Sequence, residues 1–523
     1  MIDSASMDSA PLPGRISAIV RAHAARTPEA PALSAHGRTW NYAQLAAQID
    51  AHAALLRQLG VRAGDRLMVV GENCVDQVAL IFAAAELDAW SVNVNARLSS
   101  AEVIDIARHS GARRVLYTAA ASPEARQHAI NAGAVAIAIA HGALMTGPLN
   151  DAANPEPVEP GNGQVAALVY TTGTTGQPKG VMLTHRNLLF IATVSSTLRG
   201  LTAHDRAYGV LPISHVYGLA SVMLGTLAAG ACLVLEARFS SAAMLRAIVD
   251  DGLTIVQGVP AMYARLLELA GARASSTPLP APLPSRLRFL YAGGSPLDPN
   301  LKRQVEQLFG MALHNGYGMT ESSPTISQTR LDAPRADTSV GMPIPGVAVR
   351  IVDAGGVDVA PGEAGELWVR GPNVMKGYYR DPALTRASMR PGAWLNTGDM
   401  ARQAPDGALF IVGRTRELII RSGLNVYPLE VETVLNAYPG VVQSAVVGRA
   451  LAGGNEDVVA FVECDPARPP GVQQLRDYLA QRLAPYKCPS EIVLMAALPA
   501  AATGKILKGR LKALAQDMPV TKK

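Results

Sequence analysis

The sequence predicts an α/β protein with a large N-terminal domain and a small α+β C-terminal domain. Short, continuous apolar segments alternate with Ala-rich amphipathic stretches through most of its 523 residues. Such segments are typical of strands that are buried on both faces of a sheet and covered by helices. After about residue 340 the pattern changes to short strands separated by Gly- and Pro-containing turns, which indicates a β-rich subdomain.

The clearest strands of the N-terminal part are the apolar segments 66–70, 114–117, 165–170 and 288–291. A helix is expected to follow the third of these, over 185–189. The segment 209–235 contains no Asp, Glu, Lys or Arg and is long enough to cross a bilayer. Because Pro212, several glycines and several polar residues interrupt it, we predict a buried turn, helix and strand there and not a membrane span.

The β-rich subdomain is expected over about 340–415, with strands at 347–351, 366–369 and 408–412. The remaining segment mixes short apolar strands at 444–448 and 459–463 with amphipathic helices. These patterns divide the chain into an α/β part, a β-rich subdomain and a last segment of about 100 residues that mixes strands and helices.

Composition excludes several classes of protein. With 49% hydrophobic and 17% charged residues, the chain can bury a large core, so disorder is disfavoured. A net charge of +5 over this length does not by itself indicate a nucleic-acid partner. The four cysteines show neither a CxxC pair nor a zinc spacing, and the N-terminus lacks the features of a signal peptide. We expect a cytoplasmic protein without a membrane span, and a homodimer is compatible with the sequence.

The motif with the strongest chemical signal is YTTGTTGQPKG at 170–180, placed directly after a predicted buried strand. Its glycines allow the backbone to approach an anion closely, and its N–H and hydroxyl groups can donate to phosphate oxygens. Lys179 adds a positive charge. The spacing is not that of a Walker loop. A flexible Ser/Thr/Gly linker is the alternative, but linkers rarely follow a buried strand directly.

Two further motifs suit other parts of a nucleotide. In NGYGMTE at 315–321, the glycines around Tyr317 allow its ring to face a planar base, and Glu321 offers a carboxylate to Mg²⁺. In NTGD at 396–399, Asp399 suits the paired hydroxyls of a ribose. Either motif taken alone is also compatible with an ordinary turn, the first of them capped by Thr320 or Glu321.

The fourth motif is TGKILK at 503–508, close to the C-terminus. A lysine here can reach a reacting phosphoryl or carboxylate group. A lysine in a C-terminal helix is more often a solvated surface residue, so this motif gains its meaning only from the other three.

Together these motifs resemble the adenylate-forming superfamily of acyl-CoA synthetases, peptide-synthetase adenylation domains and luciferases. The resemblance covers nearly the whole chain, from Tyr170 to Lys508 in the family's order. It implies a large N-terminal domain over residues 1–415, which includes the β-rich subdomain, followed by a small mobile domain over residues 416–523, with Arg416 at the hinge between them. It also implies an AMP-dependent acid–CoA ligase that uses ATP, Mg²⁺ and coenzyme A.

The resemblance assigns roles to individual residues. It implies that Glu321 binds Mg²⁺, that Thr320 contacts the α phosphate and that Lys505 is the catalytic lysine of adenylation. It implies that Gly423 lies beside the pantetheine tunnel on a second, thioester-forming face. The β and γ phosphates would be held by Thr171, Thr172, Gly173, Thr174, Thr175, Gly176 and Lys179. The adenine and ribose would be held by Gly293, Gly294, Ser295, Asn315, Gly316, Tyr317, Asp399 and Arg414.

The acid pocket is expected near His215, in the segment 211–218, where relatives place a histidine and an aromatic residue. A histidine satisfied inside the core is the alternative for His215. By family position, the neighbours of this pocket are Val259, Ala292, Gly316 and Met319. Because these are small or apolar, and because 218–230 carries no Asp for a substrate amine, a fatty or aryl acid is expected and not an amino acid.

The acyl acceptor has two interpretations. The first is coenzyme A, with the acid activated as acyl-AMP and then transferred to the CoA thiol. The second is the phosphopantetheine arm of a carrier protein, loaded by a stand-alone adenylating enzyme. A catalytically silent nucleotide-binding regulator is disfavoured because both Glu321 and Lys505 are present.

Overall fold

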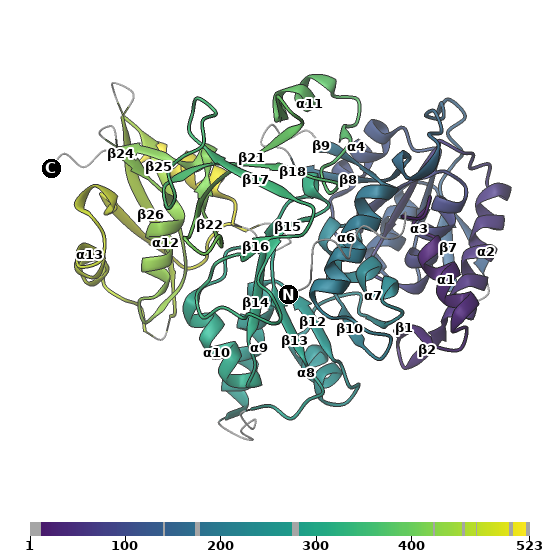
Figure 1. Ribbon diagram of the computed structural model, residues 1–523, viewed down its shortest axis with the longest axis horizontal. Coiled ribbons are helices and arrows are strands. Elements are labelled where there is room, and N and C mark those ends of the chain that lie inside the picture. Colours follow the sequence, from purple (N-terminus) through teal and green to yellow (C-terminus); the bar gives the residue numbers. More distant parts are fainter. Residues whose placement is uncertain are drawn as a thin grey trace. The chain divides into compact units, whose positions relative to one another are not determined.

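The computed structural model describes residues 12–139, 142–172, 178–274, 282–421, 424–451, 455–466, 468–500 and 506–518 (Figure 1). Its internal contacts divide the chain into two compact units. The first unit comprises Met1–Leu297, Leu301–Val349 and Val369–Leu395, and the second comprises Asp298–Asn300, Arg350–Trp368 and Asn396–Lys523. The predicted α/β fold, with a large N-terminal and a small C-terminal part, is confirmed.

The first unit contains an eight-stranded sheet in the order β19-β9-β8-β4-β3-β5-β7-β6. Its centre is parallel, because β3 pairs with β4 and β5, and β4 pairs with β8, in the same direction. All six residues of β3 are buried, as its continuous apolar sequence predicts. The strands are β3 Arg66–Gly71, β4 Trp90–Asn95, β5 Arg114–Tyr117, β6 Val135–Ile139, β7 Gly142–Thr146, β8 Val165–Thr172, β9 Pro178–Thr184 and β19 Gly377–Tyr378.

The first unit also contains a nine-stranded sheet in the order β16-β15-β14-β13-β12-β10-β11-β1-β2. Its strands β10 to β14 run parallel, whereas β15 and β16 at one edge are antiparallel. The strands are β1 Pro31–Ala35, β2 Arg38–Asn41, β10 Arg206–Gly209, β11 Cys232–Leu235, β12 Ile255–Gly258, β13 Phe289–Ala292, β14 Leu313–Gly318, β15 Thr325–Gln328 and β16 Met342–Pro343.

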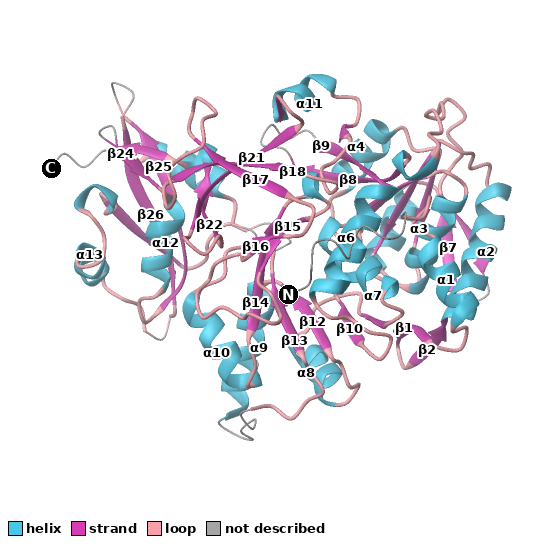
Figure 2. Ribbon diagram, in the orientation of Figure 1, coloured by secondary structure: helices cyan, strands magenta, loops and turns pink. Residues whose placement is uncertain are grey.

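Helices cover these sheets (Figure 2). Helix α3 is the most apolar of them, and nine consecutive residues from Gln77 to Ala85 are buried. Helix α6 begins at the predicted position, because the side chain of Thr184 accepts a hydrogen bond from the backbone N–H of Asn187 in a capping box. The helices are α1 Ala18–Arg26, α2 Tyr42–Gln58, α3 Val75–Glu86, α4 Ser100–Ser110, α5 Pro123–Asn131, α6 His185–Leu198, α7 Gly225–Ala228, α8 Ser241–Val249, α9 Pro260–Ala274, α10 Pro299–Phe309 and α11 Pro382–Ser388.

The uncharged segment 209–235 forms buried structure, as predicted. After β10 the chain makes a turn, a π-helical segment η3 (Tyr217–Leu224), the short α7 and then strand β11. Every residue of η3 is buried. Within the described residues, the model has no helix that is both long and apolar enough to cross a membrane.

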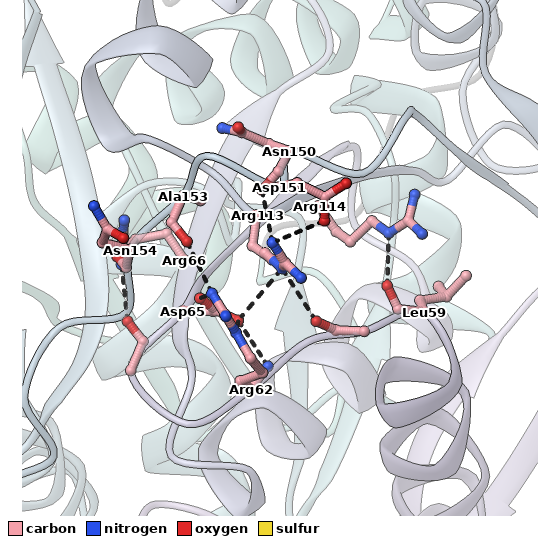
Figure 3. A network of polar contacts seen from close by, with 12 residues as sticks. Leu59, Arg62, Asp65, Arg66, Arg113, Arg114, Asn150, Asp151, Ala153 and Asn154 are labelled. Carbon is pink, nitrogen blue, oxygen red and sulfur yellow. Dashed lines mark hydrogen bonds and ion pairs between the residues drawn. The ribbon is translucent and has the colours of Figure 1, made fainter.

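A network of arginines fixes the segment around residues 147–156 to the amino ends of β3 and β5 (Figure 3). Arg66 is fully buried and donates to the carbonyl oxygens of Ser110, Gly64, Asn154 and Gly111 over distances of 2.9 to 3.2 Å. The buried carboxylate of Asp65 accepts two hydrogen bonds of 3.0 Å from the side chain of Arg62. These bonds hold a stretch without regular secondary structure against the sheet.

The second unit begins with strands of the predicted β-rich subdomain. Strand β18 lies between β17 and β21, and β22 pairs with β21. Strand β20 and the first two residues of β21, which pair with each other, belong to the first unit. The 3-10 segment η5 (Thr415–Glu417) follows β22 and contains Arg416. The strands are β17 Ala348–Val352, β18 Ala364–Arg370, β20 Met389–Arg390, β21 Trp394–Gln403 and β22 Leu409–Arg414.

The C-terminal part contains a two-stranded sheet and a three-stranded sheet in the order β25-β26-β27. Helices α12 and α14 contact β25, and α13 contacts β27. The elements are β23 Ile419–Arg421, β24 Leu424–Val426, α12 Pro428–Asn436, β25 Val441–Ala450, β26 Glu456–Cys464, α13 Val472–Ala480, β27 Glu491–Met495 and α14 Lys508–Asp517. The strands predicted at 444–448 and 459–463 are therefore confirmed.

Replacing Arg66 with Met should lower the free energy of unfolding by about 3 kcal/mol, because four carbonyl groups lose their donor and two of them, those of Gly64 and Ser110, are buried. Thermal unfolding followed by circular dichroism measures the change. Arg108→Met is the matched control, since its side chain is 75% exposed and pairs only with Asp105. The control should change stability by less than about 0.5 kcal/mol. Equal losses in the two variants would contradict a structural role specific to Arg66.

Candidate active site

The predicted phosphate-binding motif lies on the hairpin formed by β8 and β9. The strands are antiparallel, and Thr171 pairs with Lys179 in their register. The tip of the hairpin (residues 173–177), with Gly173, Thr174, Thr175 and Gly176, lies outside the described residues, as does the side chain of Thr172. The base of the hairpin is fixed by Tyr170, whose hydroxyl is 2.8 Å from Nδ1 of His109. The motif therefore begins at the end of the buried strand β8, as predicted.

Glu321 and Lys179 are brought to the same place by a residue that the sequence analysis missed, Tyr378. The hydroxyl of Tyr378 donates to Oε1 of Glu321 over 2.8 Å. Nζ of Lys179 lies 5.9 Å from the centroid of the Tyr378 ring, within the range of a cation–π contact. Strand β19 pairs with β9, which sets Tyr378 opposite Val181. Its only sequence signal is the Gly-Tyr-Tyr at 377–379.

Glu321 fits a magnesium ion. Its carboxylate is half-buried, and Oε1 accepts the Tyr378 hydrogen bond while Oε2 has no partner among the described residues. The described part of the chain holds no group of three or more His, Cys, Asp or Glu side chains that could enclose a metal. Mg²⁺ is commonly held by one or two carboxylates together with substrate phosphates and water, so a single carboxylate beside a phosphate motif is suitable. Thr320 precedes Glu321 in the 3-10 segment η4 (Thr320–Ser322) and is buried.

The predicted adenine-binding residues lie at the ends of neighbouring parallel strands. Gly293, Gly294 and Ser295 follow β13, and Ala292 pairs with Asn315 of β14. The amide of Asn315 donates to the carbonyl oxygens of Thr338 and Ser339, both at 3.1 Å. Ligands of parallel sheets bind at such carboxyl ends. The structure thus brings Asn315, Gly316 and Tyr317 next to the 293–295 segment.

Gly316 is a glycine for a steric reason. A Cβ at this position would lie 1.9 Å from the hydroxyl of Tyr291 and 2.7 Å from the carbonyl oxygen of Ser327. Gly294 has a φ of +82°, a conformation that side chains with a Cβ rarely adopt. Both glycines are therefore required for the geometry of this edge of the sheet.

His215 is exposed, whereas Val216 and Tyr217 after it are buried. The alternative of a satisfied core histidine is therefore wrong. Nδ1 of His215 lies 3.4 Å from the backbone N of Tyr217. The Tyr217 ring meets the Tyr291 ring edge-on, with centroids 6.1 Å apart. Burial raises the pKa of both tyrosines, so their hydroxyls are neutral at physiological pH.

In the second unit, the structure brings the two predicted ribose-binding residues together. Asp399 of β21 pairs with Arg414 of β22, and Nε of Arg414 lies 3.2 Å from Oδ1 of Asp399. The backbone N–H of Asp399 donates to Oγ1 of Thr397, which in turn donates to the carbonyl oxygen of Leu367. These bonds fix the position of the NTGD motif.

Gly423 and Lys505 lie outside the described residues. Residues 501–505 all lie outside the described residues, whereas Ala500 before them and Ile506 after them are described. Ala500 and Ile506 form an antiparallel bridge, and the backbone N–H of Leu507 donates to the carbonyl oxygen of Pro499 over 2.8 Å. Lys508 forms ion pairs of 2.7 and 2.8 Å with Glu417 and Glu432. The chain on both sides of the TGK motif is therefore tied to the body of the unit.

Comparisons with known proteins agree with this arrangement. The family model described as AMP-binding enzyme matches residues 20–379, and the one described as AMP-binding enzyme C-terminal domain matches 430–505. The chain is 36% identical to a feruloyl-CoA synthase of Amycolatopsis sp, over 93% of this chain and 96% of that one. It is 34% identical to an indoleacetate–CoA ligase of Aromatoleum aromaticum, over 94% and 96%.

Solved structures give the same result. ATP-bound MatB from Rhodopseudomonas palustris superposes with a TM-score of 0.84 at 28% identity, covering 97% of this chain and 99% of that one. The O-succinylbenzoate coenzyme A synthetase of Bacillus subtilis, in complex with ATP and magnesium, gives 0.80 at 30% identity, covering 94% and 99%. The chain therefore belongs to the AMP-binding enzyme family, and it is an AMP-forming acid–CoA ligase that uses ATP, Mg²⁺ and coenzyme A.

Proposed function

We propose that this ligase activates an aryl or fatty carboxylic acid, with an aryl acid as the better fit. The observation that carries the proposal is the pair of buried rings, Tyr217 and Tyr291, beside Gly293 and Gly316. Aromatic side chains next to glycines provide a flat apolar wall and the space for a planar group. The names of the relatives, a feruloyl-CoA synthase and an indoleacetate–CoA ligase, are consistent with an aromatic acid.

We assign the first half-reaction to the groups around the β8–β9 hairpin. An oxygen of the acid attacks the α phosphorus of ATP, the bond to the β-phosphate oxygen breaks, and pyrophosphate leaves. Lys179 and the 171–176 loop hold the β and γ phosphates, and Thr320 contacts the α phosphate. Glu321 would hold Mg²⁺, which would supply positive charge beside the phosphates. Lys505 stabilises the charge that grows as the two anions meet, so positioning and electrostatics supply most of the catalysis.

We assign the second half-reaction to the opposite face of the C-terminal domain, which begins at residue 416. The CoA thiol attacks the carbonyl carbon of the acyl-adenylate, the thiol proton is lost, and AMP leaves with the electrons of the broken C–O bond. Arg416 serves as the hinge, Gly423 lines the path of the pantetheine arm, and Asp399 and Arg414 hold the ribose. His215 forms a wall of the acid pocket.

We also place the enzyme in the cytoplasm. Cys74, Cys232 and Cys464 are free thiols, which suits a reducing compartment. A homodimer stays a prediction that size-exclusion chromatography with light scattering can test.

The proposed acceptor is tested by incubating the enzyme with an aryl acid, ATP and free CoA. We expect AMP and an acyl-CoA thioester, detected by mass spectrometry. Adenylate that turns over only with a phosphopantetheine-loaded carrier protein would favour the carrier-loading alternative instead.

Lys505→Ala should reduce pyrophosphate release by at least about a thousandfold while ATP still binds, because its charge acts on the reacting phosphate. Added acyl-adenylate and CoA should still give thioester in this variant. Lys512→Ala is the control, because it removes another lysine of the C-terminal part. Lys512 lies on α14, and its Nζ is 3.7 Å from Oε1 of Glu456. Normal pyrophosphate release by Lys505→Ala would disprove its role.

Tyr378→Phe should raise the Mg²⁺ concentration needed for half-maximal pyrophosphate release by about tenfold, because a hydrogen bond to a charged group is lost. Tyr379→Phe is the matched control. Its hydroxyl donates to Glu156 over 2.6 Å and does not contact Glu321. If both variants show the wild-type Mg²⁺ dependence, Tyr378 does not position Glu321.

A further inference from the structure

Arg199 is a fully buried cation without a counter-ion. It follows the last residue of α6 and is 1% exposed. Among the described residues, no carboxylate pairs with it. Its Nη1 donates to Oε1 of Gln257 at 2.5 Å and to the carbonyl oxygen of Ser221 at 3.3 Å. Burying a charge that meets only neutral acceptors is costly, so the position calls for a physical explanation.

The neighbours of Arg199 do not supply an anion. Its guanidinium lies 4.7 Å from the centroid of the Tyr291 ring. Burial raises the pKa of Tyr291, and Arg199 only partly opposes that shift, so the phenol is neutral. Burial, helped by the charges of Lys302 and Arg199, lowers the pKa of His314 to about 4, so the imidazole is neutral as well. The cluster therefore has a surplus positive charge.

The unsatisfied nitrogen atoms of this cluster are all donors. The side-chain oxygens of Gln257 and Gln328 both accept hydrogen bonds from Arg199, and the bond from Nη2 to Oε1 of Gln328 is 3.4 Å long. Nε of Arg199 and Nε2 of both glutamines are buried and have no partner among the described residues. Buried N–H groups are nearly always satisfied in native proteins. Three such donors around one cation indicate a site for an acceptor, and an anionic acceptor would also balance the charge.

The cluster lies one layer below the predicted acid pocket. Gln257 of β12 and Tyr291 of β13 are neighbours in the parallel register, and these strands lie side by side in Figure 1. Val259 and Gly293 come directly after the last residues of β12 and β13, so they lie nearer than Gln257 and Tyr291 to the carboxyl ends where ligands bind. A Cβ at position 293 would lie 3.0 Å from the Tyr291 ring, so this glycine lies against that ring.

Gly316 completes the upper layer. It pairs with Gln328 across β14 and β15. The space that a Cβ at position 316 would take is filled by the Tyr291 hydroxyl, and a Cβ at position 293 would lie 3.5 Å from the Tyr217 ring. Neither glycine adds a side chain to this layer, so its neighbours there are the Tyr217 ring and the Tyr291 hydroxyl. A substrate that enters from the strand ends would thus point its far end at Tyr291 and Arg199.

We propose that Arg199, Gln257 and Gln328 form the polar inner end of the acid pocket and bind an acceptor oxygen at the end of the substrate remote from its reacting carboxylate. The inference rests on the proposed function and narrows its substrate class to aryl acids with an oxygen substituent opposite the acid chain. Hydroxyl, ether and carboxylate oxygens share the required acceptor chemistry.

The test compares kcat/KM for acids that differ only at this end: 4-methylcinnamate, 4-hydroxycinnamate and 4-carboxycinnamate. The wild-type enzyme should prefer at least one oxygen-bearing acid to the methyl acid by about tenfold or more, because the methyl group leaves the buried donors unsatisfied. A comparison of kcat/KM between 4-hydroxycinnamate and 4-carboxycinnamate then shows whether the cluster prefers a hydroxyl or a carboxylate oxygen.

Two variants examine the cluster itself, and a third serves as their control. In Arg199→Met the ratio of kcat/KM between the preferred acid and the methyl acid should fall toward one, and Gln328→Met should reduce it several-fold. Arg66→Met is the matched control: it removes another buried arginine, and it should lower stability without changing the ratio. If Arg199→Met does not fold, the wild-type ratio and Gln328→Met carry the test.

The outcomes separate the two levels of inference. If the wild-type enzyme forms no acyl-CoA from any acid in the series, the proposed aryl substrate is wrong. If it forms thioesters but does not favour either oxygen-bearing acid, the polar inner end is wrong. A preference that persists in both Arg199→Met and Gln328→Met would also overturn it, because the recognition would then lie elsewhere.

Discussion

The hydrogen bond from Tyr378 to Glu321 is the contact on which the phosphate half of the proposed site depends. The β8–β9 hairpin, the η4 segment and strand β19 lie far apart in sequence, yet in the proposed site one triphosphate meets all three. The pairing of β19 with β9 places the Tyr378 ring near Lys179 and its hydroxyl on Glu321. One tyrosine thus contacts both Lys179, the proposed phosphate ligand, and Glu321, the proposed Mg²⁺ ligand. Electrostatic catalysis requires that such groups be held in place before the substrate arrives.

Much of the fold could be predicted from local patterns. Buried parallel strands appear as continuous apolar segments, and β3, β5, β8 and β13 were found within two residues of their ends. The start of α6 is predictable because the capping residues, Thr184 and Asn187, are close together in the sequence. Tyr378 could not be assigned a role, because its contact with Glu321 depends on antiparallel pairing between strands nearly 200 positions apart. A two-residue strand has no periodicity to detect.

The same limit explains Arg199. In the sequence alone, Arg199 is one of many arginines, and because most arginines are exposed it would be expected on the surface. Only the structure shows that Arg199 is buried. Arg66 is buried as well, and the two arginines differ in the kind of group to which they donate hydrogen bonds. Arg66 donates all its described bonds to backbone carbonyls and is satisfied as a structural tie. Arg199 has side-chain amides as partners, and those amides retain unused donors. Two equally buried cations therefore call for different explanations.

This difference has a consequence for how substrate choice evolves in such a pocket. The glycines at 293 and 316 are fixed by close contacts with Tyr291, Tyr217 and the backbone of Ser327, so they cannot be exchanged freely. The layer below them carries side chains, and a change of Arg199 or its glutamines alters the polarity of the inner end without moving the backbone of the phosphate site. Apolar replacements of similar size would remove the surplus charge and favour unsubstituted acids. Specificity in this enzyme is then set by residues that contact neither ATP nor the reacting carboxylate.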